Sequence, residues 1–462
     1  MSGLDWSIII IYLAIMLFIG IRAMRKVKTK EDFVLGGRSV GPVFVLLSLF
    51  ASWTGLSGLF GTPQYVYTYG IAGSWWWFTF PVGVYIMGMT MAKVLRRRMH
   101  RTLPDIVDSN HTSKAVRVAA SVVTVWNYLA WTAGQVAGIM LIIGTFTDLN
   151  PIVGVIITYF VMIIFTMLGG FRAVVNTDAF QAILFLIIIG VVIPLLILTH
   201  YSPTEIYAQT SGISGYYSLF ASVPAGTMFT WWMLAPSGFI DTMAFQRIFA
   251  AKDESSAKKS INIAFALMVV FGLILTFIGV ASKVILPNDI DPSGTMLLLV
   301  QELLPKGLLG LIVAAFVGVA MSTASTTLLV CSTTIEQDIY SVISSKENKE
   351  TDLKMSRILV ILIGLAALVF ALKVPSVTTI LQYGYSVYVP GLLFPVIAGT
   401  FDLKIQDKYM FATIVLGAAT SIILVILGEP IPASVGGLIA AAIPFILGLV
   451  IGKKDIAETV NE

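Results

Sequence analysis

Hydroxyl side chains gather in one apolar stretch, residues 319–327 (VAMSTASTT). The hydroxyls of Ser322, Thr323 and Thr326 lie on one face of the helix that this stretch predicts, and the backbone of residue 319 shares that face. A membrane interior offers these oxygens no water, so they must face protein or a cavity. Neutral oxygens of this kind suit a weakly held, partly dehydrated Na⁺. Small hydroxyl residues also allow close helix packing and bond back to their own helix, so this stretch alone leaves both interpretations open.

The amino-acid composition indicates a polytopic helical membrane protein. Of the 462 residues, 57% are hydrophobic and 12% are charged, which is about half the charged fraction of a soluble domain. The net charge of +4 lies mostly in the connections between apolar segments, so it bears on topology, and we expect no nucleic-acid partner. The single cysteine, Cys331, excludes an internal disulfide, and the three histidines lie at segment ends, which leaves no zinc or haem site.

About thirteen apolar segments approach the ~20 residues that a bilayer-spanning helix needs. They lie near 5–24, 41–68, 73–95, 115–146, 151–169, 178–199, 225–248, 257–286, 307–339, 355–373, 377–399, 409–427 and 434–452. Lys and Arg gather in alternate connections, around 22–38, 96–101, 172, 252–259, 346–357, 404–408 and 453–454. Because basic loops stay in the cytoplasm, we expect the N-terminus outside and the C-terminus inside. The expected location is the plasma membrane, of the bacterial inner-membrane type.

Two segments carry helix-breaking residues near their middles. The second segment contains residues 53–58 (WTGLSG), and the seventh contains residues 236–238 (PSG). These breaks lie five segments apart, at corresponding places in two five-helix halves, and an odd number of helices inverts the second half. Paired broken helices in inverted repeats indicate a transport site near the bilayer midplane. Gly and Pro are common in membrane helices, so either break alone is a weak indication.

The predicted fold is therefore an all-α polytopic membrane protein with a five-plus-five inverted-repeat core and two broken helices. We expect one transmembrane transporter domain over residues 1–462. Its expected parts are a leading helix at 5–24, a first repeat at 41–199, a second repeat at 225–399 and two C-terminal helices at 409–452. Basic residues follow the first apolar segment and do not precede it, so we expect a retained helix and not a secretory signal.

Several stretches resemble the sodium/solute symporter family. They are residues 31–39 (EDFVLGGRS), 169–181 (GGFRAVVNTDAFQ) and 321–340 (MSTASTTLLVCSTTIEQDIY), together with 245–247 (FQR) followed by 250–252 (AAK). The resemblance covers nearly the whole chain. It implies a LeuT-like fold, with an extra leading helix before the inverted-repeat core, and Na⁺-coupled alternating access.

The resemblance also implies a Na⁺ site, position by position. In the broken first core helix the ligands would be the backbone carbonyls of Ala51 and Thr54. In the eighth core helix they would be the carbonyl of Val319 and the hydroxyls of Ser322 and Thr323. Unwound backbone offers free carbonyls, and hydroxyls complete a neutral oxygen cage, which suits an ion that must leave in every cycle.

The same resemblance allows a second Na⁺ ion but does not require it. Asp178 matches a family aspartate linked to the sodium exit path. In members with two ions it shares a site with hydroxyls that map to Ser322, Ser325 and Thr326, so one or two coupling Na⁺ ions remain open. The alternative is that Asp178 only caps a helix after residues 176–177.

Solute-binding side chains are expected between the two breaks. The candidates are Ser52, Trp53, Ser57, Trp76, Trp77, Asn127, Trp131, Gln135, Trp231, Ser237, Asp241, Gln382, Tyr383 and Tyr385. Trp53 and Trp131 resemble aromatic residues of the choline-transporting branch, and aromatic faces attract quaternary ammonium groups. A third aromatic residue of that branch is replaced by Asp241, which could pair with a substrate ammonium, with Arg247 or with a backbone N–H. An amine or zwitterion, a sugar and a carboxylate all remain candidate substrates.

The expected function is Na⁺-coupled import of a small polar organic solute. The alternative is a membrane-embedded solute sensor or an uncoupled carrier, and the short tail after the last apolar segment favours a transporter. Paired carboxylates, a nucleophile with its base and a phosphate-binding loop do not stand out from the apolar segments, so we expect no enzyme activity. The expected partners are the solute, Na⁺ and the lipid bilayer, with no obligate protein partner.

Overall fold

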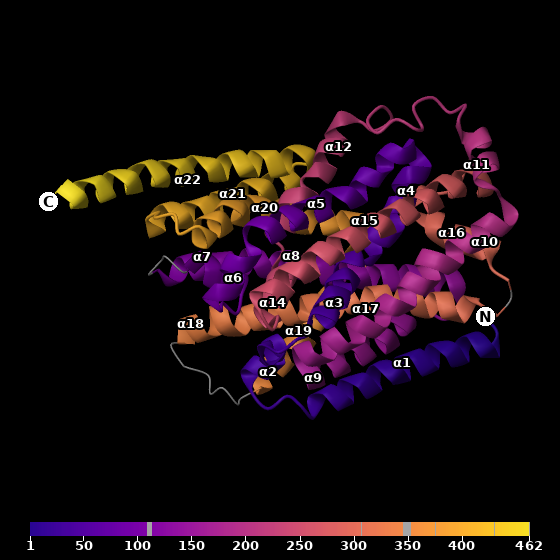
Figure 1. The fold of residues 1–462 in the computed structure, drawn as a ribbon, viewed down its shortest axis with the longest axis horizontal. Helices are drawn as coiled ribbons and strands as arrows, with labels where there is room; N and C mark the ends of the chain where they lie inside the picture. The colour runs from indigo at the N-terminus through magenta and orange to yellow at the C-terminus, as the bar shows by residue number, and fades with distance from the viewer. Residues whose placement is uncertain (109–112, 306, 345–352, 375, 429, 462) are drawn as a thin grey trace.

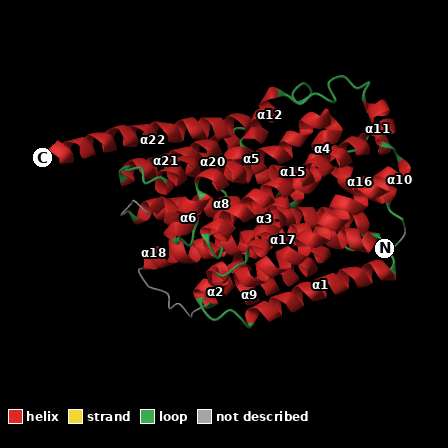
Figure 2. Ribbon diagram, in the orientation of Figure 1, coloured by secondary structure: helices red, strands yellow, loops and turns green. Residues whose placement is uncertain are grey.

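The computed structural model describes residues 1–108, 113–305, 307–344, 353–374, 376–428 and 430–461. Within these ranges the chain forms helices and connecting loops (Figure 2), and its one β-type contact is an isolated bridge between Val40 and Ala251. The expected all-α fold is confirmed. Part of the basic connection expected at 346–357 lies outside the described residues.

The helices formed by the apolar segments follow one another in chain order (Figure 1). They are α1 (Gly3–Met24), α3 (Pro42–Thr54), α4 (Leu56–Tyr69), α5 (Trp75–Thr90), α8 (Lys114–Phe146), α9 (Pro151–Ile187), α10 (Ile193–His200), α12 (Ala225–Trp232), α13 (Leu234–Phe239), α14 (Thr242–Ala250), α15 (Glu254–Ile285), α17 (Leu309–Thr334), α19 (Lys354–Lys373), α20 (Val377–Thr400), α21 (Asp407–Ile426) and α22 (Pro430–Asn461). Shorter helices in the connections are α2 (Lys30–Leu35), α6 (Ala92–Arg98), α7 (Leu103–Asp108), α11 (Pro203–Thr210), α16 (Thr295–Leu303) and α18 (Ser341–Ser344).

The count of membrane spans differs from the expected thirteen. Among the described residues, 9 helical units are long and apolar enough to cross a membrane, or up to 10 if the bent pair formed by α3 and residues 56–90 is one span. One of these units, residues 151–200, joins two of the expected segments, and Gly170 interrupts it with a φ of 51°. Helices α12 to α14 are individually too short to count. Bent and broken helices therefore account for the difference, and the expected repeat boundaries stay a prediction.

Helix α17 is the central element of the bundle. Every residue from Ile312 to Thr334 is buried, because α17 packs against α1, α3, α8, α9 and α19. A helix that is apolar on all sides and carries hydroxyls inward must find partners for those hydroxyls within the protein. This position brings the hydroxyl face of α17 against the first broken helix.

The first broken helix bends at Gly55. This residue has a φ of 24° and a ψ of 154°, and the two parts of the span are bent by 54°. The side-chain oxygen of Gln135 accepts a hydrogen bond from the backbone N–H of Leu56 at 2.9 Å and so caps the start of α4. The break leaves backbone carbonyls at the end of α3 without helical partners, as at any helix terminus.

The second broken helix differs in detail from the expectation. Residues 236–238 lie inside the short helix α13, and the breaks lie on either side of it, at Met233 and at Ile240–Asp241. Pro236 is tolerated there because N–H groups in the first turn of a helix have no helical partner. Gly238 instead allows close packing on α5, since a Cβ at this position would lie 2.4 Å from the carbonyl oxygen of Phe80.

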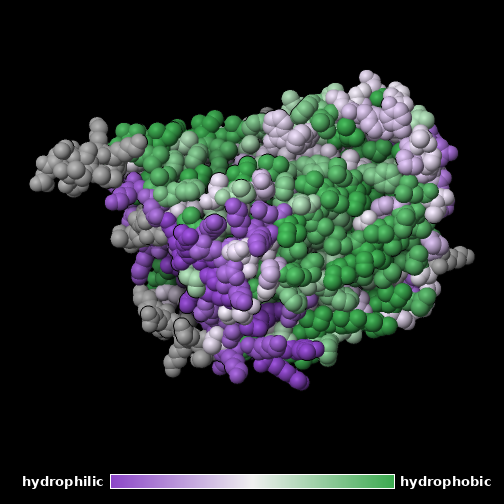
Figure 3. Space-filling view, in the orientation of Figure 1, coloured by the Kyte–Doolittle hydropathy of each residue, from purple (hydrophilic) through white to green (hydrophobic). Residues whose placement is uncertain are grey.

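One end of the bundle is strongly hydrophilic. In Figure 3, hydrophilic residues gather over the region of α2 and α6, and an apolar surface covers the region of α15. The N-terminus lies at the opposite end of the molecule from the last turn of α22 (Figure 1). This arrangement agrees with an odd number of crossings, while the orientation of the termini in the membrane stays a prediction.

Candidate functional site

The hydroxyl face of α17 meets the last turn of α3. The Ser322 hydroxyl donates to the carbonyls of Ala51 at 3.1 Å and Val319 at 2.9 Å. The Thr323 hydroxyl donates to the carbonyls of Ser52 at 3.1 Å and Val319 at 3.3 Å. The structure therefore brings together four of the five residues expected to bind the first Na⁺, Ala51 on α3 and three residues on α17, and it adds the carbonyl of Ser52.

The fifth residue, Thr54, is buried at the end of α3, and its hydroxyl donates to the carbonyl of Phe50 at 2.7 Å. Its own carbonyl directly precedes the break at Gly55. A hydroxyl that donates to a carbonyl can turn and present a lone pair to a cation, and the carbonyl can then face the same ion. This cluster of neutral oxygens can exchange internal hydrogen bonds for ion contacts without exposing a buried charge.

A buried ion pair lies beside this cluster. Asp178 of α9 and Arg247 of α14 are both fully buried, and an Asp178 carboxylate oxygen lies 3.1 Å from an Arg247 nitrogen. The same carboxylate oxygen accepts from the hydroxyls of Ser48 at 2.5 Å and Ser52 at 3.3 Å. Asp178 lies far inside α9, whose N-cap is Asn150, so the interpretation of Asp178 as a helix cap is wrong.

The residues expected at a second Na⁺ site are distributed over two environments. The hydroxyl of Thr326 joins the ion pair, because it accepts from Arg247 at 2.7 Å and shares a hydrogen bond with Ser52 at 2.9 Å. Ser325 donates back to the carbonyl of Ser322 at 3.1 Å. Arg247, which sequence reasoning considered only as a partner of Asp241, is thus the main contact of Asp178.

Asp241 is the N-cap of α14, and its carboxylate accepts three hydrogen bonds. The donors are the Trp53 indole at 2.8 Å, the Tyr128 hydroxyl at 2.7 Å and the backbone N–H of Ala244 at 2.8 Å. Of the three pairings considered for Asp241, the structure shows the backbone N–H, together with these two side chains. Asp241 therefore orients Trp53, and both of its oxygens are already engaged.

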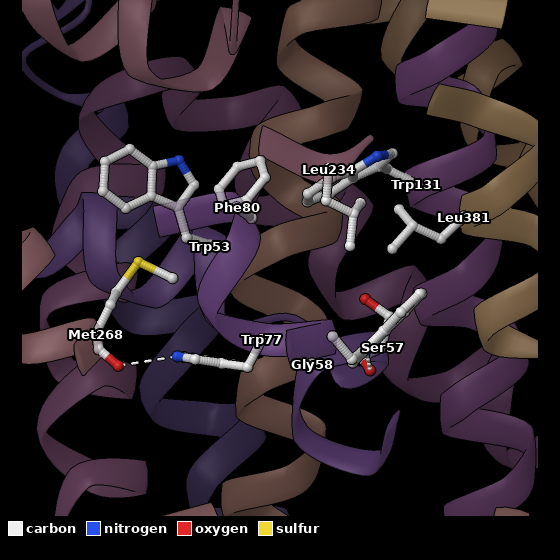
Figure 4. Close-up of a pocket in the computed structure, with 10 residues that line it drawn as sticks. Trp53, Ser57, Gly58, Trp77, Phe80, Trp131, Leu234, Met268 and Leu381 are labelled. Carbon is white, nitrogen blue, oxygen red and sulfur yellow. Dashed lines mark hydrogen bonds between the residues drawn. The ribbon is translucent and has the colours of Figure 1, made fainter. Parts of the chain in front are cut away.

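A small aromatic cavity of about 30 Å³ lies next to the break in α3 (Figure 4). It is lined by Trp53, Ser57, Gly58, Trp76, Trp77, Phe80, Trp131, Leu234, Met268 and Leu381. Trp76 donates its indole N–H to the carbonyl of Ser57 at 2.9 Å, and Trp77 donates to that of Met268 at 2.9 Å. Buried Trp131 has no hydrogen-bond partner for its indole nitrogen within the described part of the chain. The cavity thus offers mainly ring surface, with few polar groups.

Other candidate solute ligands lie outside this lining. Buried Trp231 packs against Tyr65 and Trp76, with ring centroids 4.6 Å and 6.3 Å away. Gln135 caps α4, Ser52 belongs to the ion-pair network, and Asp241 holds Trp53. Asn127 and Ser237 are buried but are not among the lining residues. Gln382, Tyr383 and Tyr385 are not among them either, whereas the adjacent Leu381 is.

Some site residues were missed from the sequence although helical spacing could have found them. Phe80 follows Trp76 by one turn, Tyr128 precedes Trp131 by one turn, and Ser48 precedes Ser52 by one turn. Leu234, Met268 and Leu381 resemble any other apolar residue of a membrane helix, so the sequence carries nothing that distinguishes them.

The model of the sodium:solute symporter family matches residues 33–417. The chain belongs to this family. It is therefore a membrane transporter that couples solute movement to Na⁺, and not an enzyme.

Individual relatives agree with the family. The chain is 27% identical to the osmoregulated proline transporter OpuE of Bacillus subtilis over 441 residues, which cover 90% of this chain and 88% of the relative. It is 26% identical to sodium/proline symporter 2 of Staphylococcus saprophyticus over 387 residues, covering 79% and 75% of the two chains. These bacterial relatives and the apolar helices support a multi-pass protein of the plasma membrane.

Solved structures support the fold. A Na⁺-coupled sialic acid symporter, described in a substrate-bound outward-open state with a novel Na⁺ site, matches with a TM-score of 0.83 and 20% identity over 98% of both chains. The nucleobase-cation symporter Mhp1 in a closed conformation matches with a TM-score of 0.58 and 16% identity, covering 92% of this chain and 95% of that one. The expected LeuT-like fold is confirmed.

Proposed function

We propose that this symporter imports a small zwitterionic solute by alternating access, and that a coupling Na⁺ binds between the end of α3 and α17. The observation that carries the proposal is the contact of Ser322 and Thr323 with the carbonyls of Ala51 and Ser52. Hydroxyls and free carbonyls form a neutral cage, which binds Na⁺ weakly enough for release.

The break in α3 links the ion to the solute. Ala51 and Ser52 present carbonyls to α17, and the next residue, Trp53, lines the aromatic cavity. Ser57 of the same cavity lies just beyond Gly55. An ion that orders the last turn of α3 therefore also fixes the indole of Trp53, so each ligand stabilises the binding conformation of the other.

The lining of the cavity favours a solute with no net charge. None of the side chains that line it carries a formal charge, and Asp241 is engaged by three donors. A free carboxylate would need a cation there, and a sugar would need several fixed polar groups to orient its hydroxyls. Aromatic faces attract an alkylated ammonium. The indole N–H of Trp131, which has no partner among the residues that the structure describes, can donate to a carboxylate.

The solutes of the relatives agree with this chemistry. Two relatives are named as proline transporters or symporters, and proline is a compact zwitterion whose ammonium lies within an aliphatic ring. We therefore propose an amino-acid-like zwitterion as the substrate class, with L-proline as the first solute to test.

Uptake of radiolabelled L-proline into proteoliposomes tests the proposal. The full chain is reconstituted, and an inward Na⁺ gradient is compared with an equal K⁺ gradient. We expect accumulation only with Na⁺. Uptake that is equal in both gradients would indicate an uncoupled carrier. If L-proline is not accumulated, thermal-shift measurements with betaines, other amino acids, sugars and carboxylates identify the solute class, and stabilisation by a sugar alone would contradict the proposal.

A further inference from the structure

Helix α1 lies along α9 and also packs against α17 (Figure 1). We propose that α1 holds the ion-binding turn of α17 in place, and that Tyr12 is the positioning residue through which it does so. The inference rests on the proposed function, because it assumes that Na⁺ binds between α3 and α17. It gives a role in ion binding to a helix that precedes both broken helices in the chain and supplies none of the proposed ligands.

Tyr12 contacts α17 directly behind the ion-binding turn. Residues 319–323 carry the proposed ligands on one face of α17, and helical periodicity places Gly318 and Met321 on another side of the same turn. The Tyr12 hydroxyl donates to the Met321 sulfur at 3.7 Å. A Cβ at residue 318 would lie 3.3 Å from the same hydroxyl oxygen, so Gly318 lets the tyrosine approach the backbone of α17 closely.

A second helix fixes the Tyr12 hydroxyl. The side-chain amide of Gln181, on α9, donates to this hydroxyl at 2.7 Å. Tyr12 is 4% exposed, and Gln181 and Met321 are fully buried. One hydroxyl thus joins α1, α9 and α17 behind the ion-binding turn, and a membrane interior offers its partners no water as a substitute.

Asp5 attaches the start of α17 to the same helix. One oxygen of its carboxylate accepts from the backbone N–H of Gly310 at 2.8 Å, and the other accepts from the backbone N–H of Ser2 at 2.8 Å. One side chain therefore satisfies free N–H groups at the starts of both α17 and α1. Gly310 permits this contact, since a Cβ there would lie 2.5 Å from the Cα of Asp5. Helix α17 is held by α1 at its start and again behind the ion-binding turn.

The consequence for ion affinity follows from the construction of the site. Its oxygens come from two helices, α3 and α17, and each must lie within roughly 0.5 Å of its binding position. If α17 can shift or rotate, part of the binding free energy is needed to restore this arrangement. A contact that fixes α17 from behind therefore raises the affinity for Na⁺ without touching the ion.

Equilibrium binding of ²²Na⁺ to the purified full chain tests the inference without knowledge of the solute. The site to be followed is the saturable one that Thr323→Ala weakens. Tyr12→Phe removes only the hydroxyl, so we expect the Na⁺ dissociation constant of this site to rise about 3- to 10-fold, as for the loss of one neutral hydrogen bond. A folded Tyr12→Phe chain with the native dissociation constant would overturn the inference and leave the proposed function standing. Native binding that is absent, or that Thr323→Ala leaves unchanged, would contradict the proposed function itself.

The matched control is Tyr159→Phe. Tyr159 lies on α9 and is 3% exposed, and its hydroxyl has no hydrogen-bond partner among the described residues. We expect the native dissociation constant in this variant. A rise equal to that of Tyr12→Phe would show that any buried tyrosine hydroxyl has this effect, which would overturn the inference.

A double-mutant cycle with Met321→Leu tests the path from Tyr12 to α17. Met321→Leu conserves the volume of the side chain and removes the sulfur acceptor, so we expect weaker Na⁺ binding from this change alone. Added to Tyr12→Phe it should cause little further loss, because both remove the same contact. Additive losses would overturn the inference. If Tyr12→Phe does not fold, Met321→Leu carries the test alone, and an unchanged dissociation constant would then overturn the inference.

Gln181→Leu in the Tyr12→Phe chain separates positioning from loss of stability. It removes the buried amide that Tyr12→Phe leaves without its partner, so the melting temperature without Na⁺ should recover. We expect the Na⁺ dissociation constant to stay raised, because the contact of α1 with Met321 is still missing. Recovery of both quantities would show that Tyr12 acts through stability alone, contrary to the proposed positioning role.

Discussion

The hydroxyl of Thr323 donates to the carbonyl of Ser52, 3.1 Å away, and so joins the most buried helix of the bundle to the last turn before a break. Ser52 contributes to two neighbouring sites. Its carbonyl faces the proposed Na⁺ site, and its hydroxyl faces the buried ion pair of Asp178 and Arg247. The next residue, Trp53, lines the aromatic cavity. One turn of α3 thus connects three chemical environments.

Removal of one ion ligand should weaken Na⁺ binding. In Thr323→Ala we expect the Na⁺ concentration for half-maximal uptake to rise by about 10- to 100-fold, since a contact to a charged group contributes roughly 1.5–3 kcal/mol. The measurement is Na⁺-dependent solute uptake in proteoliposomes.

The matched control for this substitution is Ser332→Ala. Ser332 lies on the same helix, is equally buried and donates only to the carbonyl of Leu329 at 3.0 Å. We expect its Na⁺ dependence to match that of the native chain. An unchanged Na⁺ requirement in a well-folded Thr323→Ala chain would argue against the proposed ligand set.

Asp241 should act on the solute through Trp53. Asp241→Asn replaces an acceptor of three hydrogen bonds by an amide that is also a donor. The loss of these contacts should cost roughly 1–2 kcal/mol of binding free energy, so we expect solute affinity to fall by about 10-fold. Trp53→Phe removes the indole N–H and should have a similar effect. The measurement is solute binding at saturating Na⁺.

A double-mutant cycle separates positioning from direct contact. If Asp241 acts by holding Trp53, the combined variant should lose little more affinity than either single variant, because both remove the same interaction. Additive losses would indicate that Asp241 contacts the solute directly.

The conformation of Gly55 should be required for the break. Its φ of 24° is rarely adopted by residues with a Cβ, and α3 and α4 meet only there. Gly55→Ala should destabilise the protein by about 1–2 kcal/mol and reduce Na⁺-dependent uptake. Gly134→Ala is the control, since Gly134 lies in the helix α8 and a Cβ there would make ordinary contacts at 3.6 Å. A Gly55→Ala chain with native stability and uptake would contradict this role.

Arg38 should stabilise the hydrophilic end of the bundle. It pairs with Glu31 at 2.6 Å and donates to the carbonyls of Met99 at 2.9 Å and Phe249 at 3.3 Å. These contacts join the segment before α3 to the end of α6 and to the last turn of α14. Arg38→Ala should lower the melting temperature of the purified protein clearly.

A second arginine of the same region serves as the control for Arg38. The Arg97 side chain is 71% exposed and pairs only with Glu254, and surface ion pairs contribute little. Arg97→Ala should therefore leave the melting temperature almost unchanged. Equal melting temperatures for the two variants would show that the Arg38 contacts are dispensable.

Local sequence patterns were sufficient for part of this site. The hydroxyl face of α17 follows from helical periodicity, and the first break follows from a glycine beside neutral polar residues. Four tryptophans of the expected pocket, Trp53, Trp76, Trp77 and Trp131, do line the cavity. In each case the relevant information lies within one or two turns of a single helix.

Pairings between helices could not be read from the sequence. Asp178 and Asp241 are both buried carboxylates, and only the packing of α3, α9 and α14 decides that Arg247 pairs with Asp178. The same limit applies to Gln135, which caps a helix and does not line the cavity. The second break lies on either side of α13 and not at Pro236, because a proline near the start of a short helix is compatible with that helix.

Thermal stabilisation of the purified protein by its solute tests Na⁺ coupling at the contact of α3 with α17 most directly. It is measured in Na⁺ and in K⁺ for the native chain and for Thr323→Ala. Binding to the folded state raises its stability, so the melting temperature reports occupancy. We predict that the solute stabilises the native chain in Na⁺ only. In Thr323→Ala the same stabilisation should appear only at a much higher Na⁺ concentration. Equal stabilisation in Na⁺ and K⁺ would contradict coupling through the contact of Thr323 with Ser52.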